Sequence, residues 1–195
     1  MDKSTIAYYD THAAEYSDKT RYVNMHDIRS IFLNFIEPGA RLMDIGCGGG
    51  RDMKIFDELG YTVDGIDASP AMCQVAEEYT EISVKCQDII DWKPMYTYGG
   101  IWACASLLHL KEEEFFEFFK RAEKCLSSSG VIYFSMKSGI KDGYDEDGRW
   151  YLSFDNTKLE RILSENPMFE RVRYWKTADS LKRDTVWDNV ILRKK

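Results

Sequence analysis

The chain has 195 residues, of which 44% are apolar and 30% charged, so we expect a folded globular protein. Its formal net charge of -7 argues against nucleic acid as a partner, because phosphate binding needs clustered Lys and Arg side chains. No apolar run approaches the ~20 residues of a membrane span, and the N-terminus lacks a signal-peptide pattern, which predicts a cytoplasmic protein without membrane contact. The five cysteines show no C-x-x-C spacing and the three histidines lie far apart, so neither disulfides nor a metal site are expected.

Short apolar segments alternate with amphipathic ones, a pattern typical of a parallel sheet covered by helices on both faces. Strands are predicted at 41–45, 62–66, 82–86, 100–105 and 131–136. Helices are predicted at 51–59, from Ser69-Pro70 onward, at 111–126 and at 156–163. Two final strands, 169–175 and 186–192, have no helix between them and should pair antiparallel at the sheet edge. The prediction is an α/β, doubly wound sheet of seven strands in one domain, parallel except for the last strand.

The most informative segment joins the first predicted strand to the following helix and reads Asp44-Ile-Gly46-Cys-Gly48-Gly-Gly50. Glycines between a strand and a helix allow backbone N–H groups to approach a ligand closely. A phosphate-binding P-loop requires Lys-Ser or Lys-Thr after the loop, and neither pair is present. A dinucleotide fingerprint requires a third glycine at the position of Arg51. With these two motifs excluded, the segment is an acidic residue followed by three alternate glycines, which could bind another ligand. The alternative is that the glycines form a tight turn that binds no ligand.

A second acidic residue, Asp67, ends the second predicted strand, about 20 residues after the loop. A carboxylate at this place can accept hydrogen bonds from both hydroxyls of a ribose. The alternative is a structural role, since an acid before Ser69-Pro70 also lies at the N-terminus of the next helix, where the helix dipole favours it.

Together these features resemble the class I S-adenosylmethionine-dependent methyltransferases, whose first motif has the acidic-x-G-x-G-x-G form. The likeness continues through Gln87-Asp88-Ile89 after the third strand, 105–110 after the fourth and 126–130 before the fifth. The opening of the chain, with Tyr8-Tyr9-Asp10, Ala14 and Tyr16, is similar to small bacterial methyltransferases of the tellurite-resistance type. The resemblance implies a Rossmann-like fold in a single domain, 1–195, with residues 1–36 as a helical cap over the cofactor cleft.

The resemblance also implies a site for S-adenosylmethionine. Asp44 would lie near the amino group or order the loop, the glycines would admit the methionyl end, and Asp67 would take the ribose. Asp88 would read the polar edge of adenine, or else cap the turn that follows it. The residues expected to bind the cofactor are Asp44, Gly46, Gly48, Gly50, Asp67, Ala68, Met72, Asp88, Ile89, Ala105, Leu108, Tyr9 and Tyr16. The tyrosines would close the cleft, or belong to an amphipathic helix that docks on the domain.

Catalysis of methyl transfer needs no nucleophilic triad, because the cofactor's sulfonium already makes its methyl carbon electrophilic. His109 follows the fourth strand at the ligand-binding edge and is the candidate general base, although a histidine that only packs there is the alternative. Arg149, Trp150 and Tyr151 follow the fifth strand and are expected to bind the acceptor as part of a lid. A surface loop anchored by its two aromatic residues is the alternative.

The expected function is transfer of a methyl group from S-adenosylmethionine to a small-molecule acceptor by a monomer or homodimer. Two other functions stay open: a non-catalytic module that binds the cofactor, and a nicotinamide-dependent oxidoreductase, against which Arg51 counts. The sequence does not identify the acceptor.

Overall fold

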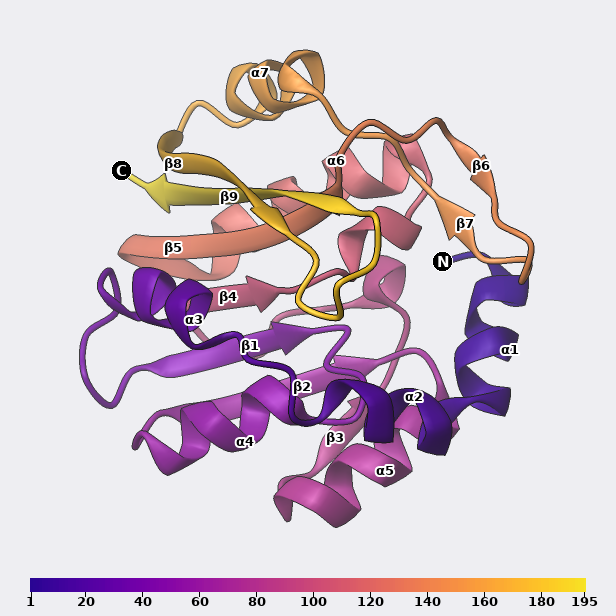
Figure 1. Ribbon diagram of the computed structural model, residues 1–195. Coiled ribbons are helices and arrows are strands. Elements are labelled where there is room, and N and C mark those ends of the chain that lie inside the picture. The colour runs from indigo at the N-terminus through magenta and orange to yellow at the C-terminus, as the bar shows by residue number, and fades with distance from the viewer.

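The computed structural model describes residues 1–195 and contains a central sheet with helices on both faces (Figure 1). The strands of this sheet are β1 (Arg41–Ile45), β2 (Thr62–Asp67), β3 (Val84–Cys86), β4 (Tyr98–Ala103), β5 (Leu126–Lys137), β8 (Phe169–Ala178) and β9 (Val186–Lys194). They lie in the order β3-β2-β1-β4-β5-β9-β8, and β9 runs antiparallel to both of its neighbours. The predicted α/β sheet of seven strands, parallel except for the last strand, is confirmed.

Alternating side chains on the strands supply two apolar layers, one on each face of the sheet. On β4, Ile101 and Ala103 belong to one buried cluster, whereas Trp102 belongs to the other. The first cluster takes its helical residues from α6 (Glu112–Cys125) and α7 (Asn156–Glu165). The second takes them from α3 (His26–Leu33), α4 (Arg51–Glu58) and α5 (Pro70–Thr80). The helices therefore cover the two faces as the β-α alternation predicts.

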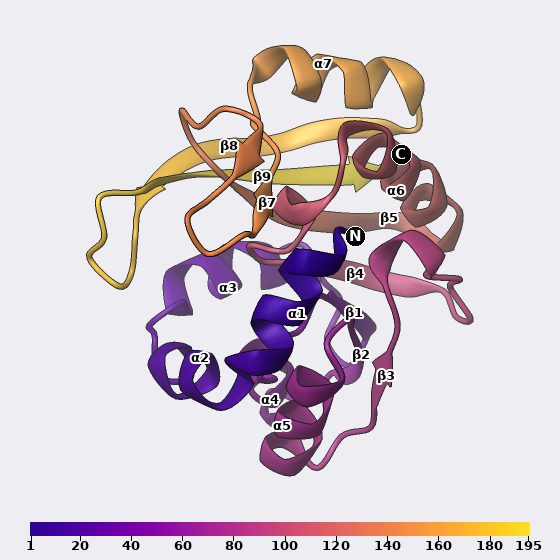
Figure 2. The same ribbon diagram turned by 90° about the vertical axis from the view of Figure 1, so that its right-hand side faces the viewer.

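The parallel strands end together at one edge of the sheet, here called the carboxyl edge. Figure 2 faces this edge and shows α1 (Lys3–Thr11) crossing in front of it, with α2 (Ala13–Thr20) beside α1. Asp10 ties α1 to the start of α5, where its Oδ1 accepts hydrogen bonds from Ser69 Oγ (3.0 Å) and Ala71 N (2.9 Å). The first two helices thus form a cover over the carboxyl edge.

The third helix differs from the predicted cap over residues 1–36. Its Phe32 is fully buried against the sheet, with its ring centroid 5.2 Å from that of Trp102. Ile36 follows in the same apolar cluster. Because these apolar side chains are buried on the sheet face, α3 belongs to the core, and the cover consists mainly of α1 and α2.

The segment after β5 contains a small hairpin that the sequence did not predict. It pairs β6 (Gly143–Tyr144) with β7 (Trp150–Tyr151). Two short 3-10 helices, η1 (Ile89–Asp91) and η2 (Leu107–His109), follow β3 and β4 at the carboxyl edge. None of the helices combines the length and the hydropathy that crossing a membrane would require.

Candidate functional site

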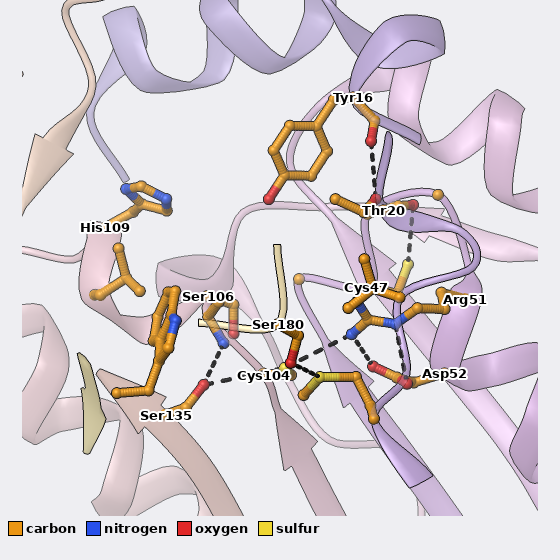
Figure 3. Close-up of a pocket in the computed structure, with 18 of the residues that line it drawn as sticks. Tyr16, Thr20, Cys47, Arg51, Asp52, Cys104, Ser106, His109, Ser135 and Ser180 are labelled. Carbon is orange, nitrogen blue, oxygen red and sulfur yellow. Dashed lines mark hydrogen bonds and ion pairs between the residues drawn. The ribbon is translucent and has the colours of Figure 1, made fainter. Parts of the chain in front are cut away.

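A cavity opens at the carboxyl edge of the sheet, and segments from the whole length of the chain line it. On one side lie the glycine loop after β1 and the ends of β2 and β4. On the other side lie the end of β5, the start of β9 and the turn between β8 and β9. Figure 3 shows the hydroxyl of Tyr16, from α2, directed into the space between His109 and Arg51.

The three predicted glycines all have positive φ, but they serve different purposes. A Cβ added at Gly46 would lie 2.5 Å from Ser106 Cβ, and one at Gly50 would lie 2.6 Å from Thr80 Cγ2. A Cβ at Gly48, whose φ is 54°, would meet nothing within 4 Å, although Gly48 lines the cavity. Gly46 and Gly50 are therefore needed for packing within the protein, whereas the open face of Gly48 is available for a ligand. Gly50 itself does not line the cavity.

Asp67 links the glycine loop to the start of α5. Its Oδ2 accepts a hydrogen bond from Gly48 N (2.9 Å), and its Oδ1 accepts one from Ser69 N (2.9 Å). Burial raises the pKa of the Asp67 carboxyl above its usual value, and the backbone N–H donors oppose that rise. The acid does lie at a helix N-terminus, but it also lines the cavity, and each oxygen keeps a lone pair for a hydroxyl donor.

Asp44 is a buried acid on the cavity wall whose carboxylate receives no hydrogen bond. Burial, with the nearby charges of Asp52 and Asp67, raises its pKa well above the usual value, while the charge of Arg51 opposes the rise. Arg51 is occupied by Asp52, with Nη2 2.6 Å from Oδ2, and Arg29 also binds Asp52 at 2.6 Å. The arrangement leaves Asp44 free to receive a cationic ligand group.

The apolar residues expected to bind the cofactor come together. Ala68, Met72, Ile89, Ala105 and Leu108 all line the cavity. Asp88 does not line the cavity: its Oδ1 accepts a hydrogen bond from Ile90 N (3.1 Å), which caps η1, and its Oδ2 lies 2.6 Å from the terminal ammonium of Met1. The capping alternative therefore describes the geometry of Asp88.

His109 is buried at the carboxyl edge and bonded through both ring nitrogens. Nδ1 lies 2.7 Å from the carbonyl oxygen of Trp150, so this nitrogen carries the hydrogen and donates it. Nε2 then accepts a hydrogen bond from the Tyr9 hydroxyl at 2.9 Å. Burial lowers the pKa of His109 to about 4, so the ring is neutral near pH 7. The Tyr9–His109 pair spans 100 residues and carries no local sequence signal.

The predicted acceptor residues are only partly brought together. Tyr151 and Arg149 line the cavity, but Trp150 does not. The indole Nε1 of Trp150 donates to Leu110 O (3.0 Å), and Lys111 Nζ lies 3.1 Å from the centre of the indole ring. Successive residues of β7 point to opposite sides, so Tyr151 can face the cavity only if Trp150 faces away. The expected contact between Trp150 and the acceptor thus has no support in the geometry.

Arg149 lines the cavity, and acids of its own turn bind two of its three guanidinium nitrogens. Its Nε donates to Asp145 Oδ2 (2.9 Å) and its Nη2 to Asp147 Oδ2 (3.0 Å). The guanidinium also lies over the ring of Tyr8, 4.3 Å from the centroid. These contacts hold the β6–β7 turn together, so a forked pair of bonds to an acceptor is not preformed.

Several cavity residues were missed by the sequence analysis. They come from the end of β5 and from the β8–β9 hairpin, namely Lys137, Asp179, Ser180, Leu181, Arg183 and Trp187. Lys137 ends a strand that runs parallel to β4, so its position at the carboxyl edge followed from the predicted topology. The turn between β8 and β9 lies at the carboxyl edge because β8 runs in the same direction as β5. The predicted antiparallel pairing of the last two strands implies this position, but it does not indicate which residues of the turn line the cavity.

Comparison with known proteins agrees with this geometry. Residues 42–130 match the family described as "Methyltransferase domain". The 18S rRNA (guanine-N(7))-methyltransferase bud23 of Schizosaccharomyces pombe is 38% identical over 80 residues, covering 40% of this chain and 30% of the relative. The ubiquinone biosynthesis O-methyltransferase of Coxiella burnetii is 26% identical over 147 residues, covering 69% of this chain and 62% of the relative. The chain thus spans less than two thirds of the length of these relatives.

Solved structures share the fold over nearly the whole chain. A 1,6-didemethyltoxoflavin-N1-methyltransferase of Burkholderia thailandensis, determined with 1,6-didemethyltoxoflavin and S-adenosylhomocysteine, superposes with a TM-score of 0.80 at 18% identity. The match covers 98% of this chain and 88% of that one. TehB of Haemophilus influenzae superposes with a TM-score of 0.74 at 19% identity, covering 92% of this chain and 66% of that one.

Proposed function

This chain belongs to the class I S-adenosylmethionine-dependent methyltransferases, and we propose that it transfers the methyl group of that cofactor to a small-molecule acceptor. The observation that carries the proposal is the open face of Gly48 between two acids on the cavity wall, Asp44 and Asp67. Asp44 lacks a partner for its carboxylate, as an acid that receives the ammonium of a methionyl group would. Each carboxylate oxygen of Asp67 accepts one backbone N–H and keeps a lone pair, with which it would accept a hydroxyl of the ribose.

When bound, S-adenosylmethionine would supply an electrophilic sulfonium methyl carbon, and the sulfur would keep the electron pair of the carbon–sulfur bond on transfer of the methyl group to the acceptor. The residues of this chain position the reactants and exclude water. Tyr9 and Tyr16 lie over the cavity with ring centroids 5.2 Å apart, and the N-terminal helices carry both. They cover the edge at which the cofactor would bind.

We infer that His109 positions Tyr9 rather than acting as the base. Its Nε2 is occupied by the Tyr9 hydroxyl, and its pKa near 4 makes it a weak proton acceptor. The alternative that the sequence left open, a histidine that packs beneath the loop, fits this geometry. A proton released by the acceptor would then pass to solvent or to a group outside this pair.

A small molecule is favoured over a nucleic acid because helices α1 and α2 cover the carboxyl edge and the chain carries a net charge of -7. Nucleic-acid binding depends on an exposed, positively charged surface. We therefore propose that the acceptor enters a covered cavity rather than lying across an open face.

Calorimetric titration with S-adenosylmethionine, S-adenosylhomocysteine and NAD tests the cofactor. We expect saturable binding of the first two and none of NAD; binding of NAD alone would favour an oxidoreductase. Release of S-adenosylhomocysteine in the presence of a panel of acceptors then tests catalysis. Tight cofactor binding without turnover of any acceptor would favour a non-catalytic module.

A further inference from the structure

Lys137, the last residue of β5, brings an ammonium group to the cavity wall without a counterion. Its Nζ makes no hydrogen bond and no ion pair in the structure. The Nζ instead lies over the ring of Tyr151, 3.8 Å from the ring centroid. A cation over an aromatic face is stabilised, but the interaction leaves all three N–H donors free.

The other two cations at this end of the cavity are neutralised by acids of their own segments. Arg149 Nη2 lies 2.7 Å from Asp145 Oδ2, and Arg183 Nη2 lies 2.6 Å from Asp179 Oδ2. Lys137 is therefore the one cation at this end of the cavity without an ion pair. An ammonium held partly out of water with free donors is best satisfied by an anionic ligand group.

The electrostatic surroundings of Lys137 agree with this interpretation. Burial, together with the positive charges of Arg149 and Arg183, lowers its pKa to about 8, and Asp145 and Asp179 oppose the shift. The group is still mostly protonated at neutral pH. An anion bound beside it would relieve the cost of keeping that charge in a half-buried place.

The walls around Lys137 are aromatic and flat. Trp187 pairs with Lys137 across β5 and β9, and its indole Nε1 is held by Asp179 Oδ2 at 2.9 Å. Tyr16 and Tyr151 face the same cavity, and neither hydroxyl has a hydrogen-bond partner within the protein. Flat walls that carry free hydroxyl donors favour a planar ligand with polar substituents.

We propose that the methyl acceptor is a planar aromatic molecule with a carboxylate, which Lys137 binds while the ring packs among Tyr16, Tyr151 and Trp187. This inference rests on the proposed function, because it assigns the β5–β9 side of the cavity to the acceptor and the glycine-loop side to the cofactor. Lys137 then selects the acceptor and takes no part in bond formation.

The test is a panel of hydroxy- and amino-substituted aromatic carboxylates, each paired with its carboxamide, in which S-adenosylhomocysteine release gives kcat/KM. We expect wild-type protein to favour the carboxylates at least tenfold, the effect of about one charge-assisted hydrogen bond. Lys137→Met should bring the ratio within about twofold of unity, and Lys137→Arg should keep most of the preference. Lys141→Met, at an exposed lysine four residues away, is the matched control and should behave as wild type.

Two further measurements separate a failure of the proposed function from a failure of the role assigned to Lys137. Calorimetric affinity for S-adenosylhomocysteine should be the same in all four proteins, and a failure of the wild type to bind it would overturn the proposed function rather than the role of Lys137. If no compound is methylated, saturation-transfer NMR on protein loaded with S-adenosylhomocysteine gives the carboxylate-to-carboxamide ratio directly. Equal or absent binding of the two series, or an unchanged preference in Lys137→Met, would overturn the acceptor assignment.

Discussion

The two sides of the cavity are built in different ways. The glycine-loop side is formed by β1, β2, β4 and the loops that directly follow them, and its polar groups are backbone N–H donors and the acids Asp44 and Asp67. The β5–β9 side combines the end of β5, the β6–β7 hairpin and the β8–β9 turn, and its polar groups are long side chains. Helices α1 and α2 cover the cavity and pack against α5. The first side depends on backbone conformation and the second on side chains that distant segments bring together.

Because the two sides are built differently, substitutions on them should have separable effects. A loop with fixed positive φ angles and a carboxylate bonded to its backbone tolerates few substitutions. On the opposite wall, substitutions in the β6–β7 and β8–β9 turns should leave the central sheet intact. A change on one side of the cavity is therefore expected to leave ligand binding on the other side unaffected.

The largest effect is expected for Asp67→Ala. Loss of two hydrogen bonds to ribose should weaken S-adenosylhomocysteine binding by ~1.5–3 kcal/mol, about tenfold or more, as seen by calorimetry. Asp64→Ala is the matched control, because Asp64 lies on the same strand but pairs with Arg41 away from the cavity (2.7 Å). An unchanged dissociation constant for Asp67→Ala, with a normal melting profile, would falsify the ribose assignment.

A smaller effect is expected for Gly48→Ala, compared with Gly39→Ala. Both glycines have positive φ, 54° and 75°, and a Cβ at either would meet nothing within 4 Å. Both variants should therefore lose a similar ~1–2 kcal/mol of unfolding free energy, measured by thermal or urea melts. Only Gly48→Ala should also weaken cofactor binding, about fivefold or more, because the added methyl group would lie where the ligand contacts the loop. Equal cofactor affinity in the two variants would show that the face of Gly48 is not a contact surface.

The pH dependence of acceptor binding tests the β5–β9 side of the cavity. Lys137, with Arg149, Arg183, Asp145, Asp179 and Tyr151 around it, has a pKa lowered to about 8. The ammonium is charged below that pH and neutral above it, so the affinity for an aromatic carboxylate should fall as the pH rises through 8. Cofactor affinity should not follow this profile, and Lys137→Met should remove it. A profile that persists in the Lys137→Met variant would assign the titration to another group.

The smallest effects are expected for Tyr16→Ala and Arg149→Ala. Tyr16 supplies a wall and a free hydroxyl, whereas Arg149 acts mainly through its ion pairs within the β6–β7 turn. Each variant should raise the acceptor KM a few-fold, and cofactor affinity should stay unchanged in Arg149→Ala. Tyr22→Ala, at a residue that is 86% exposed, is the control. If both variants kept the wild-type kcat/KM, the covering role of these residues would be wrong.

Much of the glycine-loop side could be predicted because its signals are local. Each strand and its following loop are adjacent in sequence, so Asp44, Gly48 and Asp67 could be placed together from the order of elements alone. The sheet, including the antiparallel last strand, was predictable for the same reason. Asp88 was harder, because a capping acid and a ligand-binding acid look alike in sequence, and the structure shows it capping η1.

The β5–β9 side could not be predicted to the same depth because its contacts are long-range. The orientation of Trp150 depends on the two-residue strand β7, which is too short to produce a recognisable alternation in sequence. The bond between Tyr9 and His109 joins residues 100 positions apart, and the Asp179–Arg183 pair lies between the last two strands, where no side-chain contact was predicted. Composition and periodicity carry no information about such pairings.

A crystal structure of the complex with S-adenosylhomocysteine tests the central division of the cavity most directly. The account predicts that Asp67 accepts hydrogen bonds from both ribose hydroxyls, that the amino group lies beside Asp44, and that the sulfur faces the space in front of Lys137. A complex in which the ribose lies on the β5–β9 side, or in which Lys137 binds the methionyl carboxylate, would contradict it.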